Sequence, residues 1–180
     1  LLERLPGGQR AYHRLAELSQ AKKRGYELPL LRAGIETVRR SLTHTEPGDG
    51  VLDLGTGWYF KDALLYALTG RYEVVAFDVR DLARMSYVQN YLSLLTDHTE
   101  EISNAWQLPL EPIRERLNDW RQCGSLQALL KAARIERVIG PAERMPIRDD
   151  ALSFASSYCV FPHVPPALLK EELSELYRAL

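Results

Sequence analysis

The stretch Val51-Leu-Asp-Leu-Gly-Thr-Gly57 decides the fold class of this chain. A short apolar run that ends at a glycine is typical of a strand buried on both faces of a parallel sheet. Residues 60–69 then have a helical pattern that Gly70 closes, and Glu73-Val-Val-Ala-Phe-Asp-Val79 is a second strand candidate. This order of strand, helix and strand predicts a right-handed parallel βαβ unit.

Helices are expected before this unit. Residues 10–24 are rich in good helix formers, and residues 29–40 place apolar side chains at helical spacing. Residues 43–50 are dense in turn formers and are expected to form a connector. We therefore expect a helical cap over residues 1–50 and a sheet-containing domain over residues 51–180.

After the second strand candidate, Asp81 suits the N-cap of a helix that includes residues 87–95. Residues 96–134 then break the alternation and are expected to form a helical insertion, because a connection of this length normally has structure of its own. Residues 137–140 and 153–160 are the third and fourth strand candidates. Strands that alternate with helices place the chain in the α/β class.

The clearest helix of the sequence follows Pro165 and Pro166, since proline is tolerated in the first helical turn. Its leucines fall on one face at helical spacing: Leu169, Leu173, Leu176 and Leu180. Such a stripe is expected of a helix that lies at the surface of a domain.

Composition limits the size, partners and compartment of the protein. The 180 residues, 46% of them hydrophobic, suit one compact domain. Lys and Arg total 23 against 24 Asp and Glu, and this balance disfavours binding to nucleic acid. Cys123 and Cys159 are typical of free thiols. No apolar run approaches the ~18 residues of a membrane span, and the histidines and cysteines show no metal-ligand spacing. We therefore expect a cytoplasmic protein without a metal site.

The glycines after the first strand and the acid after the second predict a nucleoside-binding site. Gly55 and Gly57 allow a tight turn and a close approach of the backbone to a ligand. Asp78 follows Gly55 at close to the ~20 residues expected for an acid that binds ribose hydroxyls. Gly-x-Gly alone is equally compatible with a simple turn, but the strand and Asp78 together favour an adenosine-containing cofactor.

Two features favour a cofactor that is not a dinucleotide. The dinucleotide fingerprint requires glycine at position 60, where this chain has Phe60. Asp53, two residues before the first glycine, suits a cationic or amine-bearing ligand and would oppose a phosphate. The alternative for Asp53 is a structural acid that accepts hydrogen bonds from N–H groups of the loop.

Four segments in order carry a resemblance to class I S-adenosylmethionine-dependent methyltransferases: residues 53–57, Asp78, residues 140–147 and residues 153–164. The resemblance covers residues 51–95 and 137–180, and it is closest to the branch that acts on small molecules, lipids and glycans. It implies S-adenosyl-L-methionine as cofactor. It also implies a Rossmann-like parallel sheet of four strands, in the order 3-2-1-4, flanked by helices.

The resemblance further implies roles for individual residues. Asp53 would lie near the amino group of the cofactor, and Asp78 would hold its ribose hydroxyls. Tyr158 would face the sulfonium and the substrate, and His163, just beyond the fourth strand, is the other catalytic candidate. The complete implied cofactor-binding set is Asp53, Gly55, Thr56, Gly57, Asp78, Val79, Ala142, Glu143 and Ser157.

Other roles stay open for several of these residues. His163 is compatible with a solvent-facing histidine beside three prolines, and Tyr158 with packing at the rim of the core. Trp106 and Trp120 suit either a substrate site or the core of the helical insertion. Methyl transfer depends on in-line alignment more than on proton removal, so the reaction does not require a catalytic base.

Three positions depart from the family pattern. Tyr59 replaces the third glycine of the first motif, Pro141 replaces an acid before the adenine-bordering alanine, and Ser153 replaces an aspartate. Glu143 is the candidate substitute for that acid. These departures motivate an alternative function, a non-catalytic methyltransferase-like scaffold that binds a partner protein. An NAD-dependent dehydrogenase is a further alternative, against which Phe60 argues.

The implied strand order leaves the fourth strand at an edge of the sheet. An open apolar edge invites association, and proteins normally cover it. Enzymes of this family continue past the last helix with further strands, whereas this sequence stops at Leu180. We therefore expect the C-terminal strands to be missing here, and the edge to be covered by the rest of a longer protein or by another chain, such as a second copy in a homo-oligomer.

Overall fold

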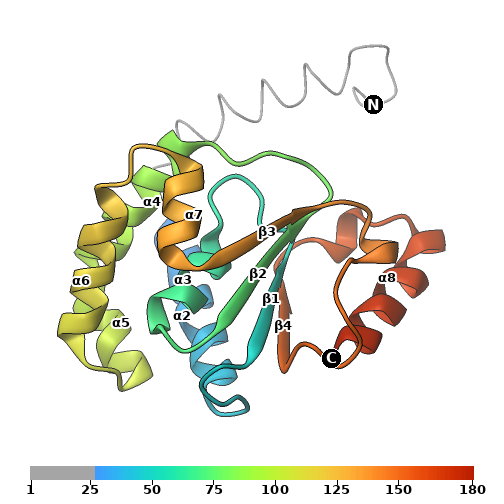
Figure 1. Cartoon of the computed structure of the whole chain (residues 1–180), viewed down its shortest axis with the longest axis horizontal. Helices are drawn as coiled ribbons and strands as arrows, with labels where there is room; N and C mark the ends of the chain where they lie inside the picture. The colour runs from blue at the N-terminus through green and yellow to red at the C-terminus, as the bar shows by residue number, and fades with distance from the viewer. Residues whose placement is uncertain (1–26) are drawn as a thin grey trace.

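The computed structural model describes residues 27–180, which form a four-stranded sheet with helices on both faces (Figure 1). The expected helix over residues 10–24 lies outside the described residues. The described elements follow in the order α2 (Glu27–Ser41), β1 (Gly50–Leu54), α3 (Lys61–Thr69), β2 (Glu73–Asp78), α4 (Met85–Asp97), α5 (Thr99–Trp106), α6 (Leu110–Arg121), α7 (Leu126–Ala133), β3 (Ile135–Ile139), the 3-10 turn η2 (Ala142–Arg144), β4 (Phe154–Ser157), the 3-10 turn η3 (Phe161–His163) and α8 (Pro166–Ala179).

The sheet confirms the predicted architecture. All pairings are parallel and the strand order is β3-β2-β1-β4. In this register Asp53 of β1 lies beside Ala76 of β2 and Ser156 of β4. Since parallel strands end at the same edge of a sheet, the loops that follow β1, β2 and β4 converge there.

Two apolar clusters cover the two faces of the sheet, as expected for a strand such as β1 that is buried on both sides. Val51 packs into the larger cluster, together with side chains of α2 to α7. Leu52, the next residue, points to the opposite face and packs with Leu176 of α8. Figure 1 shows the same division, with α8 alone among the long helices on its side of the sheet.

Helix α2 and the predicted helical insertion are both confirmed. Gly34 of α2 allows a close approach to α3, because a Cβ at this position would lie 2.5 Å from Leu65 Cδ1. The insertion comprises α5, α6 and α7, and its tryptophans Trp106 and Trp120 are buried in the larger apolar cluster. Trp106 Nε1 donates a hydrogen bond to the Ile35 carbonyl at 2.9 Å, which fixes the insertion to α2.

Two local predictions are wrong. Asp81 does not cap a helix: α4 begins at Met85 with Arg84 as its N-cap residue, and Asp81 forms an ion pair with Arg137 of β3 instead. The fourth strand is also shorter than the predicted 153–160. Cys159 has a φ of 58°, so the backbone leaves the extended conformation soon after Ser157.

Helix α8 follows the two prolines as predicted, but its buried face differs from the leucine stripe. Leu173 and Leu180 are 46% and 48% exposed, and only Leu176 of the four leucines is buried. The inner face consists of Glu172, Leu176 and Ala179. Among residues 27–180, no helix is both long enough and apolar enough to cross a membrane.

Candidate functional site

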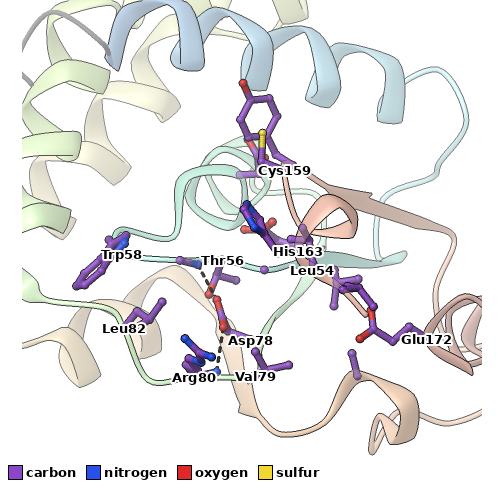
Figure 2. A pocket seen from close by; sticks show the side chains of 18 of the residues that line it. Leu54, Thr56, Trp58, Asp78, Val79, Arg80, Leu82, Cys159, His163 and Glu172 are labelled. Carbon is purple, nitrogen blue, oxygen red and sulfur yellow. Dashed lines mark hydrogen bonds between the residues drawn. The ribbon is translucent and has the colours of Figure 1, made fainter. Parts of the chain in front are cut away.

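A cavity of about 970 Å³ opens at the ends of β1, β2 and β4 (Figure 2). Nearly all of the site residues predicted from the sequence line it: Asp53, Gly55, Thr56, Gly57, Asp78, Val79, Ala142, Glu143, Tyr158 and His163. Ser157 is the exception. Its Oγ is buried and has no hydrogen-bond partner among the described residues.

The loop after β1 crosses over the end of β2. Gly55 donates its N–H to the Phe77 carbonyl at 2.7 Å, and both glycines of the loop are left-handed, with φ of 82° at Gly55 and 63° at Gly57. A Cβ at Gly55 would lie 2.1 Å from Cγ2 of Val160, whereas a Cβ at Gly57 would meet no atom nearer than 3.9 Å. The lack of a side chain at Gly55 therefore allows the loop to pack against Val160, after β4. The lack of one at Gly57 leaves room inside the cavity.

The carboxylate of Asp78 holds this loop in place. Its Oδ2 accepts the Gly57 N–H at 2.8 Å and its Oδ1 accepts the Arg80 N–H at 2.9 Å (Figure 2). The side chain is buried, with 7% of the residue exposed, and it lines the cavity. A carboxylate has about four lone-pair sites, so two remain for a ligand.

Asp53 contacts the helix that follows the loop. It is 3% exposed, and its Oδ2 accepts the N–H of Ala63, in the first turn of α3, at 3.0 Å. Burial, together with repulsion from Asp62, raises the pKa of Asp53 to about 8. Asp53 thus has a structural contact, made with α3 and not with the N–H groups of the loop that the sequence alternative named, and its contact with an amino group stays a prediction.

An ion pair beside Asp53 was missed by sequence reasoning. Lys61 Nζ lies 3.2 Å from Asp62 Oδ1 and 4.1 Å from the centroid of the Tyr158 ring, and Lys61 and Asp62 both line the cavity. Every residue of α3 is buried. The sequence signal that could have identified this ion pair is therefore the occurrence of two charged residues, Lys61 and Asp62, at the start of the helix. The ammonium group of Lys61 therefore forms a cation–π contact with the Tyr158 ring within the protein itself.

Helix α8 fixes the loop that carries Ala142 and Glu143. Arg178 donates hydrogen bonds to the carbonyls of Ile147 at 2.7 Å and Met145 at 3.2 Å. The Met145 N–H in turn donates to Oε2 of Glu175 at 3.1 Å. The position of this cavity wall therefore depends on α8, and nothing in the local sequence of residues 140–147 indicates it.

Aromatic and polar side chains form the rest of the rim. Trp58 and Tyr59 both line the cavity and pack on α4, where the Trp58 ring meets Tyr87 edge-on and the Tyr59 ring meets Tyr91. His163, in η3, is exposed and lines the same cavity. In residues 27–180, no group of three or more His, Cys, Asp or Glu side chains could hold a metal ion.

Comparisons with known proteins find similarity to solved structures. No protein-family model matches the chain, and neither does any curated protein. Among solved structures, the chain is similar to a crystal structure of a proposed S-adenosyl-L-methionine-dependent methyltransferase from Methanococcus maripaludis, with a TM-score of 0.55 and 17% identity. The similarity covers 93% of this chain and 58% of that one, so the chain spans little more than half of its neighbour's length. At this identity the likeness confirms the Rossmann-like fold.

Proposed function

We propose that this chain binds S-adenosyl-L-methionine and supports methyl transfer to a small-molecule, lipid or glycan acceptor. The observation that carries the proposal is the Asp78 carboxylate, which anchors the glycine loop and still has free lone pairs inside the cavity. An acid in this place can accept hydrogen bonds from both hydroxyls of a ribose. The methyltransferase assignment of the structural neighbour points in the same direction.

The charges around the cavity suit a cationic cofactor better than a phosphate-bearing one. Five carboxyl groups line it, those of Asp53, Asp62, Asp78, Glu143 and Glu172, although burial raises the pKa of Asp53, Asp62 and Glu172 and so reduces their negative charge. The lysine and arginine side chains in the lining are Lys61 and Arg80, and Lys61 is already paired with Asp62. Carboxylates oppose a pyrophosphate, and this balance argues against the dehydrogenase alternative.

Different residues of the chain would then contact different parts of the cofactor. When bound, S-adenosyl-L-methionine supplies an electrophilic methyl group on its sulfonium sulfur. Gly57 leaves room for the methionine part, and Val79 and Ala142 offer apolar surface to the base. Tyr158 would border the reacting end, where its ring is held against Lys61. Fixed walls favour the in-line geometry that methyl transfer needs.

Calorimetry with S-adenosylhomocysteine tests the proposal. We expect micromolar binding by the wild-type protein and a loss of at least tenfold, about 1.4 kcal/mol, in Asp78→Ala. Asp81→Ala is the matched control, because Asp81 lies outside the cavity lining and pairs with Arg137 on the surface. Wild-type protein that binds NADH but not S-adenosylhomocysteine would refute the proposal.

A transfer assay addresses the acceptor. Methyl-labelled S-adenosyl-L-methionine would be incubated with the protein and a panel of small molecules, lipids and glycans. Label transferred to any of these acceptors supports an enzyme. Cofactor binding without transfer to any natural acceptor would favour the scaffold alternative instead.

A further inference from the structure

We infer that Glu172 of α8 recognises the amino group on the base of the bound nucleoside. This inference rests on the proposed function and adds a specificity-determining residue to it. Glu172 lies within the range 137–180 that the methyltransferase resemblance covers but outside the four segments that carry it, and the leucine pattern of α8 gave no reason to select it.

The first observation is that one carboxyl oxygen of Glu172 is buried without a hydrogen-bond partner among the described residues. The residue is 5% exposed, and its Oε2 has no hydrogen-bond partner among the described residues. It nevertheless lines the cavity, and Figure 2 shows its side chain extending from α8 toward Leu54. A buried carboxyl oxygen without a partner is costly, so a ligand donor at this point would compensate for its burial.

The second observation is the apolar surface around Glu172. Leu54 and Ala142 belong to the apolar cluster that also contains Leu176, one helical turn after Glu172 on the same face of α8. Leu54, Ala142 and Glu172 all line the cavity. A flat heterocycle against such apolar walls would be desolvated, and a single polar group at its edge would then determine which base is accepted.

The third observation is that the loop before Ala142 supplies no acidic side chain of its own. Pro141 stands where the family pattern has an acid, and proline has neither a polar side chain nor an N–H. Glu143 lines the cavity too, and its charge adds to burial in raising the pKa of Glu172. A carboxyl group accepts a hydrogen bond from an amino group in either protonation state, so Glu172 can supply the missing acceptor from α8.

The test compares two ligands on the same protein. The ligands are S-adenosylhomocysteine and its 6-deamino analogue, in which hydrogen replaces the amino group of the base. We expect the wild-type protein to prefer the amino form by about tenfold, since a site that places a buried acceptor against a donor rejects the analogue lacking it. The ratio of two affinities measured on one protein does not depend on how much of a variant is folded.

Two variants and a control decide the outcome. Glu172→Leu should reduce the preference to less than about twofold, whereas Glu172→Gln should keep it, because the amide retains an acceptor oxygen. Glu171→Leu, on the exposed side of the same helix, should match the wild type. A tenfold preference retained in Glu172→Leu, or absent from the wild type that binds both ligands, overturns this inference and leaves the proposed function intact. Binding of neither ligand by the wild type overturns both.

Discussion

Substituting Gly57 by alanine tests whether the loop after β1 carries the ligand. Gly57 has a φ of 63°, a left-handed conformation that alanine adopts at a cost of roughly 1–2 kcal/mol. The new methyl group would meet no protein atom closer than 3.9 Å, so strain is the only stability cost that we expect. The same methyl group would enter the cavity, and we expect S-adenosylhomocysteine affinity to fall by at least tenfold.

Two other glycines make this substitution interpretable. Gly48→Ala introduces left-handed strain at a φ of 97°, in open space and away from the cavity, so it should destabilise the protein similarly and bind normally. Gly55→Ala adds a clash, because its Cβ would lie 2.1 Å from Cγ2 of the branched Val160 side chain. Overpacking of this kind costs about 1–3 kcal/mol beyond the strain.

Urea denaturation and calorimetry on the three variants separate these effects. The free energy of unfolding should fall least in Gly48→Ala and Gly57→Ala and most in Gly55→Ala. Binding should weaken at least tenfold in Gly57→Ala but be retained in Gly48→Ala. If Gly57→Ala binds S-adenosylhomocysteine as tightly as Gly48→Ala does, the backbone at Gly57 does not approach the ligand and the reasoning fails.

Two further predictions concern ionisation and association. Asp53 has its pKa raised in the folded protein from 3.8 to about 8, so the native state holds a proton that the unfolded state loses, and its contribution to stability falls as pH rises between these values. Asp53→Asn should therefore flatten the free energy of unfolding over this interval by up to about 1.4 kcal/mol per pH unit, and an unchanged profile in urea titrations would contradict the assignment. The second concerns β4, which pairs only with β1 among the described strands, while Leu173 and Tyr177 of α8 are 46% and 85% exposed. If a second copy covers this side, sedimentation should show a dimer that Leu173→Glu with Tyr177→Glu dissociates, and a wild-type monomer at all concentrations would exclude that form of cover.

The parts of the fold that sequence predicted are those fixed by local pattern. The run from Val51 to Leu54 is apolar except for Asp53 and is buried on both faces of a strand, and Gly70, at a φ of 70°, closes α3 where the pattern placed its end. Two prolines likewise located the start of α8. Each of these signals depends on neighbouring residues only, so each can be interpreted without knowledge of the tertiary structure.

The failures share a dependence on partners distant in sequence. Asp81 has the chemistry of an N-cap, but Arg137 of β3 pairs with it, and no local pattern can indicate that contact. The face of α8 that is buried depends on where the sheet and η2 lie, so Leu173 was as plausible an inner residue as Leu176. Lys61 was overlooked for a related reason, since a lysine in the first turn of a helix is normally solvated.

The cavity explains an exception to the rule that charged side chains stay at the surface. Five charged residues in the described part of the chain are buried: Asp53, Lys61, Asp62, Asp78 and Glu172. All five line the cavity, although they come from β1, α3, β2 and α8. Burial of a charged group reduces stability unless the group is fully paired. Asp62 Oδ1 forms an ion pair with Lys61 Nζ at 3.2 Å, but Oε2 of Glu172 has no hydrogen-bond partner among the described residues. Stability alone would favour apolar residues at these positions, so their convergence on one cavity supports the proposed binding of a ligand that carries hydrogen-bond donors.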